Sequence, residues 1–163
     1  MGLMNALSDR SDWQNLKIFT GLLAFPYPIL QNPNVFVSSG YYGPIERFLN
    51  EAGANMDYLP ASFTGFEKYI LQNKPSLIAA TVSDPDSEGF VTFGTHAGAS
   101  YIPFLKACQS PDQLAIAEVN PQMPLVYGAP EHGDNKIKLS DIPFWYECDQ
   151  SQLEYAPQDP TEV

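Results

Sequence analysis

A single acidic residue, Glu118, lies in the otherwise apolar run Ile-Ala-Glu-Val-Asn-Pro-Gln-Met-Pro at positions 116–124. The residues from 114 to 120 predict a buried strand, with Glu118 near its carboxyl end. Ligands of α/β sheets bind at that edge, where a carboxylate can serve as an acid, a base or a nucleophile. A structural carboxylate held by the N–H groups of a loop would have the same sequence pattern, and position alone favours this structural role.

A second acidic group has the spacing with which calcium loops begin: Asp84, Asp86 and Glu88, followed by Gly89. An EF-hand loop also needs a bidentate Glu at its twelfth position and a helix on each side. Thr95 stands at that position, and both flanks have the composition of strands. The segment therefore predicts a solvated turn, and we expect no metal site.

The two histidines, His96 and His132, are far apart in the sequence and lack zinc-ligand spacing. No Ser or Cys is placed to suggest a catalytic triad with either of them. The glycines make neither a dinucleotide fingerprint nor a P-loop. The spacing of these residues alone therefore does not identify a reaction.

The elements that must position these groups alternate along the chain. Short β-branched or apolar runs predict strands, and amphipathic spacing bounded by Pro or Gly predicts helices. The predicted strands are 16–21, 34–40, 56–61, 76–83, 90–94, 114–120 and 136–142. The predicted helices are 44–52, 64–73 and 100–108. This order predicts an α/β fold, a mostly parallel sheet covered by helices.

Three details of these elements are specific enough to check. The helix after Pro44 should bury one face, made of Ile45, Phe48, Leu49 and Ala52. Thr64 and Glu67 have the spacing of a capping box at the start of the next helix. The strand 76–83 is apolar over most of its length, which predicts burial on both faces, and 90–94 should return from it as an antiparallel partner.

Length and charge limit the functions open to the chain. Its 163 residues suffice for one domain, and 19 acidic against 8 basic residues give a net charge of −11. The basic residues are scattered singly, so we expect no nucleic-acid partner and no anionic membrane partner. No apolar run approaches the ~18 residues of a membrane-spanning helix.

The remaining features bear on compartment and domain limits. The N-terminus has no secretory signal, so we expect the cytoplasm and reduced thiols at Cys108 and Cys148. From 147 to 163 the chain is acidic, contains two prolines and lacks basic residues. We interpret 1–146 as part of one α/β domain and 147–163 as a linker.

Several stretches, taken in order, resemble a known family. They are LKIFTG, SGYYGPIERFLNEAG, VSDPDSEGF, IAEVNPQMP and HGDNKIKLSDI, with TEV after the Pro-containing acidic segment. Together they resemble the N-terminal domain of the acetyl-CoA hydrolase/transferase family, particularly its 4-hydroxybutyrate CoA-transferase branch. Leu22 and Leu23 depart from the pattern, because some relatives have a small Ala-Ser pair there.

The resemblance implies an incomplete domain of the NagB/RpiA/CoA-transferase fold group. The family moves CoA between an acyl-CoA and a small carboxylic acid such as acetate or 4-hydroxybutyrate, or onto water. Its nucleophilic glutamate belongs to a C-terminal domain that would be this chain's partner, and nothing here matches that residue. We therefore assign no catalytic residue and no cofactor, with coenzyme A as a substrate, and expect the chain alone to be inactive.

The resemblance and the predicted strand ends together give a candidate substrate cleft. Its residues are Thr20, Gly21, Ser38, Ser39, Gly40, Ser83, Asp84, Asp86, Glu118, Asn120 and Met123. Surface bared by absent parts of the family's fold predicts a homo-oligomer. The alternative is a non-catalytic interaction module that keeps the fold. A sugar-phosphate isomerase of the same fold group is disfavoured, because no phosphate-binding loop is visible.

Overall fold

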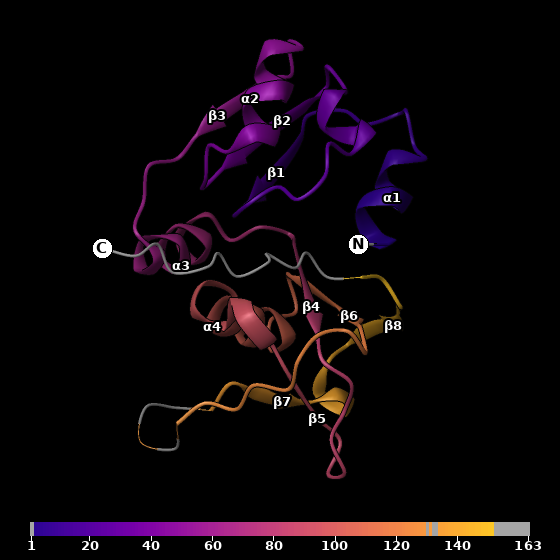
Figure 1. Cartoon of the computed structure of the whole chain (residues 1–163), viewed down its shortest axis with the longest axis vertical. Coiled ribbons are helices and arrows are strands. Elements are labelled where there is room, and N and C mark those ends of the chain that lie inside the picture. Colours follow the sequence, from indigo (N-terminus) through magenta and orange to yellow (C-terminus); the bar gives the residue numbers. More distant parts are fainter. Residues whose placement is uncertain (1, 130, 132–133, 152–163) are drawn as a thin grey trace, which may run out of the picture.

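The computed structural model describes residues 2–129, 131 and 134–151. Two three-stranded parallel sheets and one antiparallel pair organise this part of the chain (Figure 1). The first sheet has the order β1-β2-β3, the second has the order β4-β6-β8, and β5 pairs with β7. The α/β class and the mostly parallel strands predicted from the sequence are confirmed.

The first sheet is built from the amino-terminal third of the chain. Its elements, in order, are α1 (Gly2–Ser8), β1 (Leu16–Thr20), a short 3-10 helix (Pro28–Gln31), β2 (Val35–Ser39), α2 (Pro44–Glu51) and β3 (Met56–Tyr58). β-branched and apolar residues alternate in β2, and its buried Val35 and Val37 pack with Leu49 of α2. One face of this sheet is therefore covered by α2 together with the 3-10 helix, whose Ile29 and Leu30 belong to the same buried cluster.

The second sheet and the antiparallel pair follow. Their elements are α3 (Phe63–Asn73), β4 (Leu77–Val82), β5 (Phe90–Thr92), a 3-10 turn (Gly94–His96), α4 (Ala97–Cys108), β6 (Leu114–Val119), β7 (Lys136–Lys138), a 3-10 turn (Leu139–Asp141) and β8 (Phe144–Glu147). Phe93 and Phe104 are fully buried between α4 and one face of this sheet, with their rings edge to face.

Helix α3 joins the two halves. It packs on α4 (Figure 1). The ring centroids of its Phe66 and Tyr69 lie 6.2 and 4.9 Å from that of Phe19 in β1. α3 thereby covers part of the face of the first sheet that α2 leaves open. The carboxyl ends of both parallel sheets carry the candidate residues.

The buried face of α2 differs from the prediction. Phe48 is 52% exposed, whereas Glu46 is fully buried beside Leu49. The spacing of apolar residues predicted that Phe48 would face inward. Glu46 was expected to face solvent, because burying a carboxylate without hydrogen-bond donors is costly. Here such donors exist, and they turn Glu46 toward the protein.

Three other expectations about the elements were wrong. α3 begins at Phe63 after the N-cap Ser62, so Thr64 is a helical residue and caps nothing. β4 is not buried on both faces, because Leu77 is 37% exposed. β5 pairs with β7 and not with β4. The strand β8 and the helix α1 were not predicted.

Candidate functional site

Four of the candidate residues form one group at the carboxyl end of the first sheet. Thr20 and Ser39 are register partners, and their hydroxyl oxygens lie 3.4 Å apart. The N–H of Gly40 donates to the Thr20 carbonyl at 2.8 Å. The Ser39 hydroxyl oxygen lies 2.7 Å from the Tyr41 carbonyl oxygen and 3.3 Å from that of Gly21. These contacts join the loops that leave β1 and β2.

Ser38 belongs to the other face of β2, because side chains alternate along a strand. Its register partners are Phe19 and Asp57. Gly40 lies where α3 comes close, since a Cβ there would be 2.6 Å from the Phe66 ring. A glycine at this position lets the helix pack against the strand end.

Glu46 is a site residue that the sequence did not reveal. One carboxylate oxygen accepts the N–H of Leu23 at 3.0 Å and lies 3.2 Å from the Ser39 hydroxyl oxygen, and the other accepts the N–H of Gly43 at 3.0 Å. The buried carboxylate thus holds the loop after β1 against the start of α2. Its position, three residues after Gly43 and close to Pro44, was the available signal.

Ser83, Asp84 and Asp86 form a turn at the end of β4, as predicted. The Ser83 hydroxyl accepts the N–H of Thr92 at 3.0 Å. One oxygen of Asp86 accepts two N–H groups of its own turn, both at 2.9 Å, and the other accepts the Tyr127 hydroxyl at 3.0 Å. Asp84 is exposed. Asp86 therefore shapes the turn, and the backbone N–H of Phe90 is the main cause of its lowered pKa.

Glu118 is 6% exposed and lies near the carboxyl end of β6. It accepts hydrogen bonds from the Tyr146 hydroxyl, from the backbone N–H of Gly2 at 2.7 Å, and from the Thr81 hydroxyl at 3.3 Å. The Tyr146 oxygen in turn accepts the N–H of Leu3 at 2.8 Å. Glu118 therefore fastens the start of α1 onto the second sheet.

The electrostatics of this cluster follow from these contacts. Burial acts to raise the pKa of Glu118, but its hydrogen bonds, with that from Tyr146 foremost, hold the pKa below the usual value. Burial and the Glu118 charge raise the pKa of Tyr146 well above its usual range and also raise that of the buried Tyr27. Glu118 is thus ionised and Tyr146 protonated near neutral pH.

Asn120 and Met123 shape the bend that follows β6. The Asn120 side chain accepts the N–H of Gln122 at 2.8 Å and donates to the Gln150 carbonyl at 2.9 Å. Met123 is 6% exposed, and its sulfur would lie 2.2 Å from a Cβ at Gly94. Asn120 is fully buried and Met123 nearly so, and both are held in contact with neighbouring segments.

His96 has a serine partner that spacing did not suggest. Its Nδ1 lies 2.8 Å from the hydroxyl oxygen of Ser100, and its Nε2 lies 2.8 Å from the carbonyl oxygen of Thr81. Burial lowers the pKa of His96. His96 is the N-cap of α4, whereas the predicted helix began only at Ser100, so the i, i+4 relation of the pair was not apparent from the sequence. His132 lies outside the described residues.

The candidate residues fall into two groups. Thr20, Gly21, Ser39 and Gly40 lie together on the first sheet. On the second sheet, the N–H of Asn120 donates to the Val82 carbonyl at 2.9 Å, which places the bend beside Ser83. No hydrogen bond among the described residues connects the two groups.

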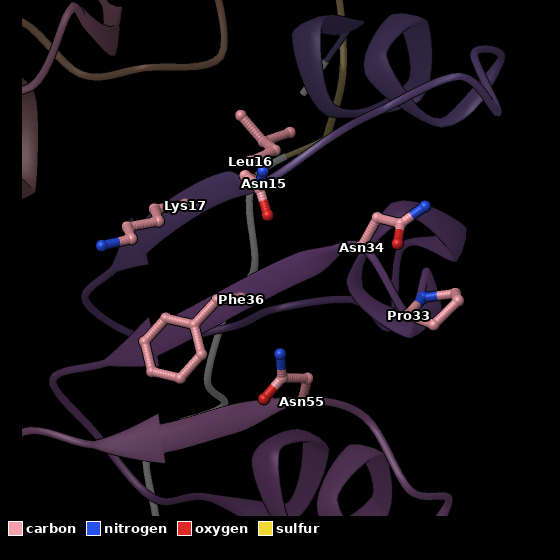
Figure 2. A pocket seen from close by; sticks show the side chains of 7 residues that line it. All are labelled: Asn15, Leu16, Lys17, Pro33, Asn34, Phe36 and Asn55. Atoms are coloured by element: carbon pink, nitrogen blue, oxygen red, sulfur yellow. The ribbon is translucent and has the colours of Figure 1, made fainter.

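A shallow hollow of about 170 Å³ lies at the opposite, amino end of the first sheet (Figure 2). It is lined by Asn15, Leu16, Lys17, Pro33, Asn34, Phe36 and Asn55. None of the candidate residues lines it. Ligands of open α/β sheets bind at the carboxyl ends of the strands, so this hollow is separate from the candidate cleft.

Over the described part of the chain, no three His, Cys, Asp or Glu side chains gather in a way that could hold a metal ion. Cys108 and Cys148 are both free thiols, and burial raises the pKa of Cys108 to about 11. A thiol with such a pKa is unreactive near neutral pH. No described helix has the length and apolar character needed to cross a bilayer.

Comparison with solved structures identifies the class of fold. RipA from Yersinia pestis shares 22% sequence identity over 98% of this chain, with a TM-score of 0.71. The structure of a single-residue mutant of RipA gives a TM-score of 0.76 at 21% identity. A 4-hydroxybutyrate CoA-transferase from Porphyromonas gingivalis shares 20% identity over 96% of this chain, with a TM-score of 0.57. The chain therefore has the fold of part of these proteins.

The chain spans 38% of the RipA chains and 41% of the 4-hydroxybutyrate CoA-transferase chain. No protein-family model matches the sequence. No curated protein matches it either. The likeness is consequently one of fold.

Proposed function

We propose that this chain is the amino-terminal portion of a CoA-transferase or acyl-CoA hydrolase. Such an enzyme moves CoA between an acyl-CoA and a small carboxylic acid, such as acetate or 4-hydroxybutyrate, or transfers the acyl group to water. In this proposal the nucleophilic glutamate belongs to a carboxyl-terminal domain outside this sequence. The cytoplasm is the proposed compartment.

The observation that carries the proposal is the fold shared with a 4-hydroxybutyrate CoA-transferase over 96% of this chain but only 41% of that protein. The residues proposed for the cleft lie at the carboxyl ends of parallel strands, where such folds bind ligands. The motif resemblance supports the same assignment.

Glu118 is a poor candidate for the nucleophile. A carboxylate that attacks a thioester needs a free lone pair aimed at the substrate. Glu118 instead accepts hydrogen bonds from Tyr146, Thr81 and the Gly2 N–H, and it is nearly inaccessible. We assign it to the wall of the cleft, where it positions α1.

The proposal is tested with the protein from the intact reading frame that contains this sequence. Transfer of CoA from acetyl-CoA to 4-hydroxybutyrate, or release of free CoA, is followed by thiol detection and mass spectrometry. We expect activity from the intact protein and none from residues 1–163 alone. An intact protein that forms no product from any short acyl-CoA would overturn the proposal.

One observation favours a second candidate, a non-catalytic interaction module. The side chains of Leu77 and Phe144 are 37% and 56% exposed on a face of the second sheet, and parallel sheets are ordinarily covered on both faces. A partner subunit could cover this face without any chemistry. A reading frame that holds no further domain, with no active intact protein, would favour this candidate.

A further inference from the structure

The strongest unassigned chemistry lies at the start of α4. Ser100 stands one turn after His96, and the Ser100 hydroxyl oxygen lies 2.8 Å from His96 Nδ1. Neither residue belongs to the candidate cleft. A serine hydroxyl within hydrogen-bond reach of a neutral imidazole is the arrangement that activates a serine nucleophile.

The tautomer of His96 is fixed by the contact of its second ring nitrogen, Nε2. Nε2 lies 2.8 Å from the carbonyl oxygen of Thr81, which can only accept a hydrogen bond. Nε2 must therefore carry a proton, and in the neutral ring Nδ1 is left with a lone pair directed at Ser100. The Thr81 carbonyl takes the orienting place that a carboxylate has in a catalytic triad.

The ring competes with the backbone for the hydroxyl proton. The Ser100 oxygen also lies 2.8 Å from the carbonyl oxygen of His96, a contact common for serine in helices. The neutral Nδ1 has no other donor in the described structure, whereas carbonyls of a helix already accept backbone N–H groups. The Ser100 hydroxyl can thus donate either to the His96 carbonyl or, while His96 is neutral, to Nδ1, and nucleophilic attack uses the second arrangement.

The surroundings of His96 favour its neutral form. Burial lowers the pKa of His96, so the imidazole is a base at neutral pH. Ser100 is only half-buried, so its hydroxyl is not sealed from solvent.

We propose that Ser100 and His96 form a nucleophilic dyad that accepts acyl groups from small activated esters and thioesters. The Ser100 oxygen bonds to the acyl carbon while its proton passes to His96 Nδ1. The tetrahedral intermediate then breaks the bond to the leaving alcohol or thiol, which takes that proton. Water releases the acid from acyl-Ser100 by the same steps, and the dyad is restored.

This inference is independent of the proposed CoA transfer, since it requires no residue outside the chain. The probes are p-nitrophenyl acetate and a fluorophosphonate, with release of nitrophenol and intact mass as readouts. We expect one adduct per chain, mapped to Ser100, and at least a tenfold loss of release in S100A and H96Q. Release should rise with pH through a pKa below the ordinary 6.5 of histidine.

The matched control is S110A, because Ser110 lies just beyond the same helix and caps only the N–H of Asp112. It should label like the unsubstituted chain. Thermal unfolding of S100A and H96Q separates loss of labelling from loss of fold, and a variant that does not fold is replaced by S100T or H96N. An unlabelled folded chain, or labelling that persists in S100A, would overturn the dyad.

Discussion

The hydroxyl of Tyr146 in β8 donates a hydrogen bond to the carboxylate of Glu118 in β6, its register partner. The same Tyr146 oxygen accepts the N–H of Leu3, and the same carboxylate accepts the N–H of Gly2. Strands β6 and β8 and the amino terminus of α1 are thus joined by hydrogen bonds around the Glu118 carboxylate. This is the contact through which α1 is attached to the second sheet.

Removal of the Tyr146 hydroxyl should weaken this attachment. We expect Tyr146→Phe to lower the free energy of unfolding by about 1–3 kcal/mol, because the buried Glu118 loses a hydrogen-bond donor. Urea denaturation measures the change. The exposed Tyr42→Phe serves as the control and should unfold like the parent chain. An unchanged midpoint in Tyr146→Phe would contradict the attachment.

Glu118 should also make the fold sensitive to acid. Its folded-state pKa lies below the unfolded value, so its stabilisation is present above the unfolded pKa and lost as the pH falls through the folded pKa. Glu118→Gln should remove this contribution. The urea midpoint is measured from neutral pH to below the ordinary carboxyl pKa, and it should fall less steeply with pH in the variant than in the parent chain. Parallel plots of midpoint against pH would refute the prediction.

His96 gives a second pH dependence at higher pH. Burial places its folded-state pKa below the unfolded value of 6.5, so stability is full above that value and is lost as the pH falls through the folded pKa. His96→Gln keeps a donor for the Thr81 carbonyl but cannot take up the proton. Stability of the variant should change less than that of the parent chain below pH 6.5. Equal slopes would show that the pKa of His96 is the same in the folded and unfolded states and would contradict the prediction.

Gly40 should tolerate no side chain. An alanine Cβ would lie 2.6 Å from the Phe66 ring, so the contact between α3 and the end of β2 must open. We expect Gly40→Ala to cost about 1–3 kcal/mol in urea denaturation. Gly98→Ala is the matched control, because its Cβ meets nothing within 4 Å and the change should stabilise α4 by up to ~1 kcal/mol. A cost for both or neither would count against this packing.

The open face of the second sheet predicts self-association. Phe144 and Leu77, 56% and 37% exposed, lie on the face opposite α4. Light scattering across a concentration series should show a rising mean mass, and Phe144→Lys should keep the chain monomeric by placing a charge on that face. The exposed Phe48→Lys on α2 is the control. A compact monomer at high concentration would contradict this expectation.

The α/β class was predictable because strand-length apolar runs alternate with helices bounded by Pro or Gly. The turn at Asp84 and Asp86 was predictable for a similar reason, since turn residues act locally. The strand β8, with the sequence Phe-Trp-Tyr-Glu, was missed. It is stabilised by pairing with β6, whose residues lie 28 positions earlier, and this pairing cannot be read from the local sequence.

The candidate site was harder to predict because its contacts are not local. The inward turn of Glu46 depends on donors from the loop after β1, and the role of Glu118 depends on Gly2 and Tyr146. Spacing marked only Glu118 as unusual, because that residue interrupts an apolar strand. Whether the eleven predicted residues line one cleft stays a prediction.

The central claim is that the loops at the strand ends serve a CoA-transfer reaction whose nucleophile is elsewhere. Its most direct test is CoA transfer from acetyl-CoA to 4-hydroxybutyrate by the protein of the intact reading frame, compared with its Glu118→Gln variant. We predict transfer by the parent protein and substantial transfer by the variant at a temperature where it is folded. Transfer abolished in folded Glu118→Gln, with a trapped acyl or CoA adduct at Glu118 of the parent, would contradict the account.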